Sequence, residues 1–430
     1  MINMKKMPKH KILVIGGGFA GLNVLKTLKK ADVDILLLDK TNHHLFQPLL
    51  YQVATSALSS TDIATTLRDV FKNQSNAEVL LADVSRIDKH NKRVIAANGE
   101  TFSYDYLVLA PGCKHSYFNN PEWEEFAPGL KSLNDANQIR DNIMLSFENA
   151  ERATDPLESK KFMTFVVIGG GPTGVEMAGA IAELAHKSLN GSFKKINPCE
   201  SIIYLIEGTD QVLPIFPKDL ALKAKGYLEK MGVQVLLNTF VTNITEKGVW
   251  LGSKLIETSN IIWAAGNEAS PILKSLDVPL DKFNRVIVES DLSIPGFPEI
   301  FVIGDAACSI GIDGKPLPGF APVAIQQGKY VGKIIKKQIP KKDRKPFKYF
   351  DKGMMATVGS GKAIAMTGKV KLSGFIAWLA WSMIHIIYLV TFTNRFFVSL
   401  NWLYLYLMHK RKSKIIVRPI SESTNKTSVE

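Results

Sequence analysis

Two glycine-rich segments have the residue types and the spacing of loops that hold a pyrophosphate. Their glycines are Gly16, Gly18 and Gly21 in KILVIGGGFAGLNVLKTLKK, and Gly169, Gly171 and Gly174 in FVVIGGGPTGVEMAGAIAELA. Such a loop binds a dinucleotide when a strand precedes it, a helix N-terminus faces the phosphates, and an acid ends the next strand. Both segments meet these conditions, so the sequence predicts two dinucleotide sites in one chain.

The elements that would position these loops are two β-α-β units. We expect a strand at 11–15, a helix at about 20–30 and a strand at 34–39, and then a strand at 162–168, a helix at 174–186 and a strand at 201–207. Asp39 ends the first unit and Glu207 the second, where a carboxylate accepts hydrogen bonds from a ribose. Glu207 would repel a 2′-phosphate, which favours NADH over NADPH. Lys40 is expected to serve the first nucleotide or solvent.

The order of the elements predicts an α/β fold in which one Rossmann-like domain is interrupted by another. After the first unit comes a strand ending in YDYLVLAPG, and NIIWAAGN follows the second unit in the same way. The late strand EIFVIGDAA returns the chain to the first domain. The expected domains are 1–123 with 282–345, then 124–281, a membrane-anchoring region of amphipathic helices at 346–414, and a polar tail at 415–430.

The net charge of +13 is concentrated at the C-terminal end. Residues 341–430 hold 16 Lys and Arg against 4 Asp and Glu, whereas the rest of the chain is close to neutral. Within this basic region, LSGFIAWLAWSMIHIIYLVTFTN and FFVSLNWLYLYLMH carry no Asp, Glu, Lys or Arg. Basic flanks around apolar, aromatic runs indicate contact with a membrane surface rather than with nucleic acid.

The cysteines and histidines do not form a metal site in this sequence. Cys113, Cys199 and Cys308 are far apart and form no C-x-x-C pair, which favours a reducing compartment and excludes a local iron–sulfur or zinc motif. His43 and His44 are adjacent, which is a poor spacing for two ligands of one metal. We therefore expect no metal.

The combination of these motifs resembles the two-dinucleotide-binding flavoproteins over about residues 11–332. Within that superfamily, NHHLFQPLLYQVATSALS, GGGPTGVEMAGA and LPGFAPVAIQQGKYVG, followed by the amphipathic C-terminus, are similar to the type II NADH dehydrogenases, the single-subunit NADH:quinone oxidoreductases. The resemblance implies non-covalent FAD in the first domain and NADH in the second.

The resemblance also implies site residues. Asp305 would bind the ribityl or phosphate region of the flavin. Glu176, expected in the first turn of the second helix, would position nicotinamide or pass protons to the reduced quinone, unless it is a plain N-terminal helix glutamate. The family's quinone motif corresponds to Pro322, Gln326 and Gln327, with Pro322 in place of the first glutamine. The other expected cofactor contacts are Phe19, Ala20, Gln47, Ala110, Gly112, Thr173, Ala265, Gly266, Ala324 and Ile325.

These features together predict an enzyme that moves hydride from NADH to FAD and then two electrons to a membrane quinone. The chain has no dithiol to take the electrons, and its apolar C-terminus favours a lipid-dissolved acceptor. One membrane-like segment cannot build the polar relay of a pump, so we expect no proton translocation. The alternatives are a sulfide:quinone oxidoreductase, in which Cys113 and Cys308 would react, and a flavin-bearing membrane sensor or scaffold of low turnover.

The uncharged segment 372–394 is long enough to span a bilayer as a helix. The resemblance instead favours helices lying in the interface, on the cytoplasmic face of the inner (plasma) membrane, with a single transmembrane helix as the alternative. The aromatic residues expected at headgroup level are Trp378, Trp381, Tyr388, Trp402, Tyr404 and Tyr406. A homodimer is a further expectation left open by the sequence.

Overall fold

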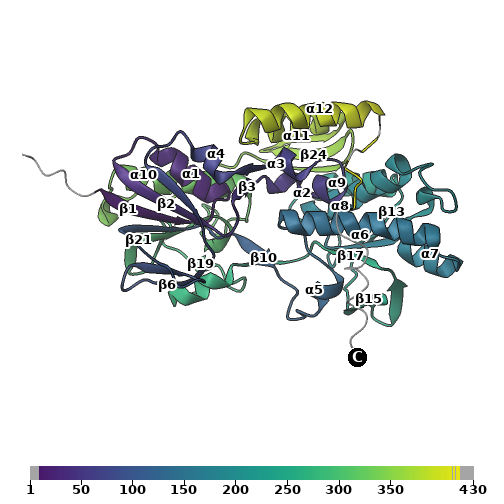
Figure 1. Ribbon diagram of the computed structural model, residues 1–430, viewed down its shortest axis with the longest axis horizontal. Coiled ribbons are helices and arrows are strands. Elements are labelled where there is room, and N and C mark those ends of the chain that lie inside the picture. The colour runs from purple at the N-terminus through teal and green to yellow at the C-terminus, as the bar shows by residue number, and fades with distance from the viewer. Residues whose placement is uncertain (1–8, 409, 412, 417–430) are drawn as a thin grey trace, which may run out of the picture. The chain divides into compact units, whose positions relative to one another are not determined.

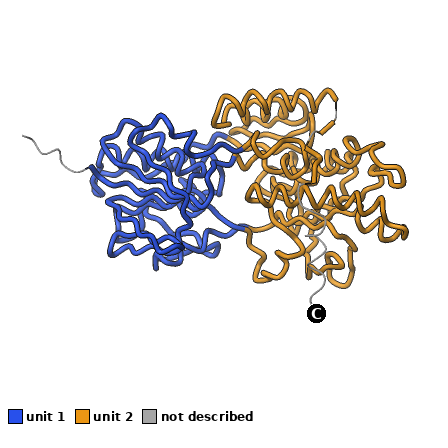
Figure 2. The backbone as a smooth tube through the Cα atoms, in the orientation of Figure 1, with its two compact units in different colours: residues 1–45, 64–114, 267–352 blue, residues 46–63, 115–266, 353–430 orange. Residues whose placement is uncertain are grey.

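The computed structural model describes residues 9–408, 410–411 and 413–416 of the 430-residue chain. The chain divides into two compact units (Figure 2). Unit 1 comprises residues 1–45, 64–114 and 267–352, and unit 2 comprises residues 46–63, 115–266 and 353–430. The expected polar tail at 415–430 lies outside the described residues except for its first two.

Unit 1 is built on a six-stranded sheet with the order β20-β21-β9-β1-β2-β5 (Figure 1). Its strands are parallel except β20, which pairs antiparallel with β21. They are β1 (His10–Ile15), β2 (Val33–Asp39), β5 (Ala77–Leu81), β9 (Tyr106–Leu109), β20 (Ser293–Ile294) and β21 (Phe297–Val302). In β1, Ile12, Leu13 and Val14 are all buried, as expected for a parallel strand covered on both faces.

Two helices of unit 1, α1 (Phe19–Leu28) and α10 (Ala321–Lys336), pack against each other. Gly328 permits their close approach, because a Cβ there would lie 2.3 Å from the carbonyl oxygen of Ala20. The other elements of unit 1 are β3 (His43–Leu45), β4 (Ala64–Thr66), α4 (Leu67–Phe71), β6 (Val84–Asp88), β7 (Arg93–Ala96), β8 (Thr101–Ser103), β18 (Asn267–Ala269), η4 (Pro271–Leu276), β19 (Val286–Ile287), η5 (Gly304–Ala306), β22 (Ala307–Cys308) and η6 (Lys341–Asp343). The chain passes between the units five times, after residues 45, 63, 114, 266 and 352; the third passage falls within β10 (Cys113–His115) and the fourth just before β18.

Unit 2 repeats the same plan with a four-stranded parallel sheet, β13-β12-β11-β17. Its strands are β11 (Thr164–Ile168), β12 (Ile202–Ile206), β13 (Val233–Leu236) and β17 (Asn260–Trp263). An antiparallel sheet of β14 (Asn243–Thr245), β15 (Gly248–Leu251) and β16 (Lys254–Glu257) completes the β structure of this part. The helical elements are η1 (Gln47–Leu49), α2 (Leu50–Ala54), α3 (Ser60–Ile63), α5 (Trp123–Phe126), α6 (Leu133–Arg152), α7 (Pro156–Phe162), α8 (Pro172–Glu183), the π-helical turn η2 (Leu184–Ser188), η3 (Pro198–Glu200) and α9 (Lys218–Glu229). The predicted fold class, with two Rossmann-like β-α-β units, is confirmed.

The C-terminal part of unit 2 forms a three-stranded sheet and two helices. These elements are β23 (Met354–Gly359), β24 (Lys362–Thr367), β25 (Val370–Gly374), α11 (Phe375–Tyr388) and α12 (Phe392–Met408). The uncharged run at 372–394 is therefore divided between a strand, a helix and the start of a second helix. Among the described residues, no helix combines the length and the apolar character that crossing a membrane requires.

Candidate active site

The first glycine loop leaves room for phosphates where side chains are missing. Gly16 has φ +98°, and a Cβ there would lie 2.2 Å from the carbonyl oxygen of Ala110. A Cβ on Gly21 would lie 1.9 Å from the carbonyl oxygen of Gly16, so both positions exclude any side chain. A Cβ on Gly18 would meet nothing within 4 Å, and no side chain caps the N-terminus of α1 at this residue. The open space beside uncapped backbone N–H groups fits the pyrophosphate of FAD.

Asp39, at the end of β2, is hydrogen-bonded to the backbone of this loop and of the turn that follows the strand. Its Oδ2 accepts the Gly17 N–H at 2.5 Å, and its Oδ1 accepts the backbone N–H of Thr41 at 2.7 Å. The carboxylate is thereby fixed beside the loop, where carboxylates of such folds accept ribose hydroxyls. Lys40, which follows it, is exposed.

His44 is a residue of this loop region whose role the sequence did not reveal. Its Nδ1 lies 2.9 Å from the carbonyl oxygen of Gly17, so Nδ1 carries the hydrogen and donates it. Burial lowers the pKa of His44 to about 4, which keeps the imidazole neutral at physiological pH. The ring therefore orients the Gly17 peptide by a hydrogen bond from strand β3.

Asp305 lies in the turn η5 near the end of unit 1, and a buried glutamine is hydrogen-bonded to this turn. Gln327, on α10 and 1% exposed, accepts the Gly304 N–H at 2.7 Å and donates to the Ser309 hydroxyl at 2.8 Å. The Cys113 thiol donates to Asp305 Oδ2 at 3.1 Å. Gly319 lies against the same carboxylate, since a Cβ there would lie 3.0 Å from its Oδ1.

The residues of the expected quinone motif already have protein partners. Gln326 donates to the Phe350 carbonyl oxygen at 2.8 Å and accepts the Phe350 N–H at 3.0 Å, and Gln327 holds the Gly304 turn. A ligand that used either amide would have to replace these bonds. Pro322 lies in the first turn of α10, and Ala324 and Ile325 are buried on the same helix. The quinone role of these residues stays a prediction.

The second glycine loop, in unit 2, has the same construction as the first. Gly169 has φ +107°, and a Cβ there would lie 2.8 Å from the carbonyl carbon and oxygen of Ala264. A Cβ on Gly174 would lie 1.8 Å from the carbonyl oxygen of Gly169. Gly171 is the N-cap residue of α8, which has no side-chain cap, and a Cβ on Gly171 would meet nothing within 4 Å. This cradle fits a second pyrophosphate.

The acid of the second loop is held as Asp39 is held in the first. Glu207 Oε2 accepts the Gly170 N–H at 2.6 Å, and its Oε1 accepts the Thr209 N–H at 2.8 Å. Two further residues expected to contact this nucleotide lie nearby in the chain. Thr173 is exposed in the first turn of α8, and Gly266 forms a turn with φ +75° after β17.

Gln47, expected near the flavin, lies in unit 2 and donates to the Lys131 carbonyl oxygen at 3.3 Å.

Glu176 lies one turn further along α8 than the sequence indicated. The helix begins at Pro172, so the first turn contains no acidic residue. The prediction that the helix dipole stabilises the charge of Glu176 was therefore wrong. Glu176 accepts a backbone hydrogen bond from Thr357, which lies on β23. The residue is half-buried and lines a cavity, and burial raises the pKa of its carboxyl group to about 8. The carboxyl group is therefore largely protonated at neutral pH.

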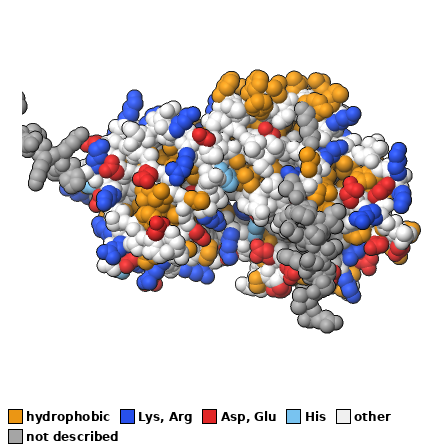
Figure 3. All heavy atoms as spheres, in the orientation of Figure 1, with side chains coloured by type: hydrophobic (Ala, Val, Ile, Leu, Met, Phe, Trp, Pro, Cys, Tyr) orange, Lys and Arg blue, Asp and Glu red, His pale blue; other side chains and the backbone are white. Residues whose placement is uncertain are grey.

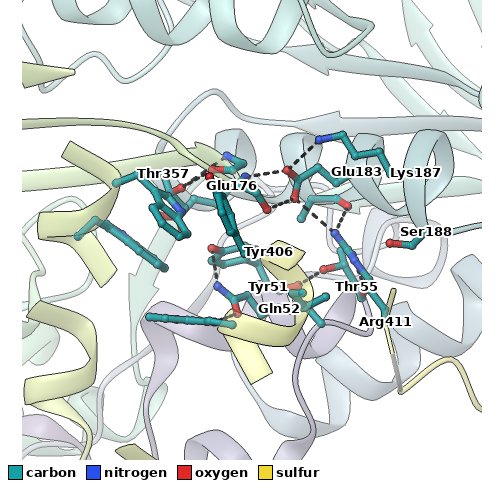
Figure 4. A pocket seen from close by; sticks show the side chains of 18 residues that line it. Tyr51, Gln52, Thr55, Glu176, Glu183, Lys187, Ser188, Thr357, Tyr406 and Arg411 are labelled. Carbon is teal, nitrogen blue, oxygen red and sulfur yellow. Dashed lines mark hydrogen bonds and ion pairs between the residues drawn. The ribbon is translucent and has the colours of Figure 1, made fainter. Parts of the chain in front are cut away.

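The cavity beside Glu176 is assembled from segments that are far apart in the sequence (Figure 4). Its volume of about 70 Å³ suits one end of a ligand rather than a dinucleotide. The aromatic residues that line it are Tyr51, Trp378, Trp381, Trp402 and Tyr406, and the polar residues include Gln52, Thr55, Glu176, Glu183, Lys187, Thr357, Ser360 and Arg411. A flat, apolar ring with polar atoms at its edge suits such walls.

The aromatic lining differs in part from the expectation for the C-terminal aromatic residues, because three tryptophans of α11 and α12 face a cavity. Trp381 is 2% exposed and stacks on His385 with ring centroids 4.1 Å apart. Trp378 stacks on Tyr406 at 5.6 Å, and both line the cavity with Trp402. The large side chains exposed on α11 and α12 are mainly aliphatic and phenylalanine, with Tyr406 as the one exposed tyrosine among them: Phe375, Ile376, Leu379, Met383, Ile384, Ile387, Phe392, Phe396, Phe397, Leu400, Leu403, Tyr406, Leu407 and Met408. Packing of the indoles against the cavity explains the difference.

Arg411 lines the cavity from the far end of the described chain, a contact that the sequence did not reveal. Its guanidinium donates to the backbone carbonyl oxygens of Thr55 and Ala180 and pairs with Glu183 at 3.7 Å. Glu183 also accepts the Ser360 N–H at 2.7 Å. Burial lowers the pKa of Arg411 to about 10, which leaves it charged at neutral pH. A buried cation and a carboxylate thus compensate each other beside the neutral Glu176.

Comparison with known proteins agrees with this geometry. The pyridine nucleotide-disulphide oxidoreductase family matches residues 10–328, which defines the class as a flavoprotein with two nucleotide-binding units. The type II NADH:quinone oxidoreductase Ndh of Mycobacterium tuberculosis is 43% identical over 94% of this chain and 89% of that protein. The chain therefore belongs to the type II NADH:quinone oxidoreductases.

Solved structures give the same fold. The structure of NDH2 from Plasmodium falciparum in complex with NADH has a TM-score of 0.86 at 21% identity and covers 95% of this chain and all of that one. The sulfide:quinone oxidoreductase from Aquifex aeolicus is more distant, with a TM-score of 0.70 at 16% identity over 97% of this chain and 95% of that one. At these identities both likenesses concern the fold alone.

The two cysteines required by the sulfide alternative are poorly placed to react. Cys308 is buried, which raises the pKa of its thiol, so little of it is the reactive thiolate. The Cys113 thiol donates its hydrogen to Asp305. The chain is thus an FAD-dependent enzyme of the NADH-oxidising family, and the sulfide alternative is not supported.

Proposed function

We propose that unit 1 holds FAD on the Gly16 loop, that unit 2 holds NADH on the Gly169 loop, and that the cavity beside Glu176 receives the quinone head group. The observation that carries the last assignment is a protonated carboxyl group in an aromatic-walled cavity. Quinone oxygens are acceptors, and an aromatic wall suits a flat ring. FAD supplies a group that takes a hydride and releases electrons to an acceptor.

Glu207 gives the second loop its preference for NADH. Its carboxylate lies 2.6 Å from the Gly170 N–H and is available to the hydroxyls of the adenine ribose. A 2′-phosphate in that position would meet a negative charge rather than a hydrogen-bond acceptor, so NADPH binds less well. The preference for NADH over NADPH is therefore set by Glu207 at the end of β12, and not by the cavity beside Glu176.

Glu176 supplies a proton to the quinone. Reduction of a quinone to a quinol takes two electrons and two protons, and a carboxyl group with a pKa of about 8 can donate one of the protons at neutral pH. Glu183, seven residues further along α8, accepts from Ser360 and pairs with Arg411 and Lys187. No proton crosses a membrane in this scheme.

The exposed apolar side chains of α11 and α12 attach the enzyme to the membrane surface. Figure 3 shows hydrophobic side chains gathered over α12, and Arg395 and Lys410, near its two ends, are exposed. Such a surface suits helices lying in the headgroup region, on the cytoplasmic side of the plasma membrane. Replacing Leu403 and Leu407 by Asp should release the protein from vesicles, as measured by co-sedimentation. A homodimer also stays a prediction.

The test of the function is spectroscopic. Purified protein should show the visible absorption of bound flavin, which NADH should bleach and a quinone should restore, with repeated turnover when both are present. Protein that keeps its flavin colour on addition of NADH, or stays bleached after addition of quinone, would refute the corresponding half of the reaction.

A further inference from the structure

Tyr51 presents a hydroxyl group to the Glu176 cavity in an orientation fixed by two other side chains. Gln52 Nε2 donates to the Tyr51 hydroxyl oxygen at 2.9 Å, and Trp402 Nε1 donates to Gln52 Oε1 at 2.7 Å. Tyr51 and Gln52 lie on α2 (Figure 4), Trp402 lies on α12, and all three line the cavity. A helix with an exposed apolar face is thereby joined to the cavity wall.

The direction of each hydrogen bond follows from the chemistry of the indole. An indole N–H can only donate, so the atom of the Gln52 amide that faces Trp402 is its oxygen. The amide NH₂ then faces Tyr51, and the Tyr51 oxygen must be the acceptor. The orientation of Gln52 is thus determined by Trp402 and does not depend on an arbitrary assignment of its nitrogen and oxygen.

The hydroxyl hydrogen of Tyr51 is left for the cavity. In the described part of the chain, the bond accepted from Gln52 is the only hydrogen bond of this hydroxyl group. Tyr51 is 7% exposed, and the cavity is where it reaches free space. A buried O–H that donates to no protein group is costly unless a ligand or water accepts from it.

We propose that the Tyr51 hydroxyl donates a hydrogen bond to a carbonyl oxygen of the bound quinone, and that Trp402 and Gln52 position it for this role. The inference rests on the function proposed for the cavity. The chemistry of the ligand agrees, because quinone oxygens only accept. In this arrangement, Tyr51 and protonated Glu176 are the two groups that donate to the quinone oxygens.

The two donors have different tasks. Burial, and the charge that Glu176 carries when ionised, raise the pKa of Tyr51 well above that of free tyrosine, so its proton stays in place throughout. Glu176, with a pKa of about 8, gives up its proton more readily. Tyr51 therefore binds the oxygen on which negative charge develops and supplies no proton, and its bond strengthens as the quinone is reduced.

Tyr51→Phe removes the donor and keeps the ring. We expect kcat/KM for quinone to fall about tenfold or more, with loss in both KM and kcat. Reduction of ferricyanide by NADH, which needs no quinone site, should be unchanged, as should the flavin content. The Kd of a short-chain quinone, measured by quenching of tryptophan fluorescence, should rise in parallel. Tyr227→Phe, a partly buried tyrosine on α9 that does not line the cavity, is the matched control and should behave as wild type.

Trp402→Phe tests the positioning role without touching the donor. It frees the Gln52 amide to turn, so a smaller loss of kcat/KM for quinone is expected, and the double variant should lose no more than Tyr51→Phe alone. Trp250→Phe, on β15, controls for loss of an indole N–H elsewhere. If Tyr51→Phe fails to fold, the fluorescence Kd of Trp402→Phe still tests the proposal.

The outcomes separate the two levels of the proposal. A wild-type enzyme that reduces no quinone would refute the proposed function and this inference with it. A wild-type enzyme that reduces quinone, beside a Tyr51→Phe variant with the same kcat/KM and Kd, would refute the inference alone. Losses that add fully in the double variant would mean that Trp402 acts independently, which would overturn its positioning role.

Discussion

The loop at Gly16 and the loop at Gly169 are built alike, yet the helices that follow them serve different purposes. In each, a glycine with positive φ ends the first strand, and an acid accepts the N–H of the next glycine, at 2.5 Å in unit 1 and 2.6 Å in unit 2. Helix α1 is then covered by α10, where Gly328 allows close contact. Helix α8 carries Glu176 and Glu183 along the wall of a cavity instead.

The comparison separates the part of each unit that is built alike from the part that differs. In the proposed function the glycine loop and the acid hold the nucleotide, and both units build them in the same way. The helix that follows the loop packs against α10 in unit 1, whereas in unit 2 it lines a cavity with Glu176 and Glu183. Four predictions test this division.

Alanine at the two loop glycines should separate the two units. In Gly16→Ala the Cβ would lie 2.2 Å from a carbonyl oxygen, and in Gly169→Ala 2.8 Å, each at a positive φ. We expect Gly16→Ala to lose its flavin and all activity, and Gly169→Ala to keep flavin but lose NADH oxidation. Flavin absorbance per protein and NADH-ferricyanide assays measure both. Gly226→Ala, whose Cβ meets nothing, should be unaffected; equal loss of flavin in both loop variants would contradict the division.

Glu176→Gln should damage the reaction with quinone while both nucleotide sites still work. The loss of a proton donor is expected to lower kcat with quinone roughly 100-fold and to leave the NADH-ferricyanide reaction intact. In the wild type, the carboxyl group loses its proton above a pH of about 8, so kcat with quinone should fall there, and the variant should lack this decline. Glu257→Gln, at an exposed position on β16, is the control. An unchanged pH profile would exclude Glu176 as the donor.

Replacement of each of the two acids by its amide should have unequal effects on the preference between NADH and NADPH. Glu207→Gln removes the charge that opposes a 2′-phosphate and should raise the preference for NADPH relative to NADH roughly tenfold. Asp39→Asn should leave this preference unchanged and weaken retention of FAD. The ratio of kcat/KM for the two nucleotides is the measurement. A shift caused by Asp39→Asn as large as that caused by Glu207→Gln would show that the units are not specialised.

The buried carboxyl group should also affect stability. The folded protein keeps the Glu176 proton up to a pH of about 8, whereas the unfolded chain loses it near 4.5. Between these values the folded state binds more protons, so stability falls as pH rises, by up to about 1.4 kcal/mol per pH unit. Thermal melting of Glu176→Gln across this range should show a smaller decline than the wild type. Parallel curves would mean that Glu176 is ionised in the folded protein.

The nucleotide loops could be predicted from the sequence because their determinants are local. Within about 30 residues, a strand, three glycines, a helix and an acid define the first cradle, and backbone geometry does the rest. The starts of the helices were harder to place. Pro172 fits the first helical position, which moved Glu176 out of the first turn and removed the dipole argument.

The cavity could not be predicted, because its residues come from segments that are far apart in the sequence. Tyr51, Glu176, Thr357 and Trp402 share no spacing pattern, and only the folded chain brings them together. The same limit applies to the C-terminal aromatic residues. An apolar helix has a covered face and an exposed face, and the composition alone did not show that the indoles belong to the covered one.

The contact between Arg411 and Thr55 has a consequence for folding. The two residues are separated by 356 positions, so the contact closes a loop that includes most of the chain. Contacts of such high order form late, because the entropy of closing the loop is lost before any of its interactions is gained. Other contacts between the same segments, such as Trp402 with Gln52, span nearly as many residues. A partly folded chain would therefore carry the Glu183 carboxylate without its guanidinium partner, and the cavity would close only when the C-terminal segment docks, late in folding.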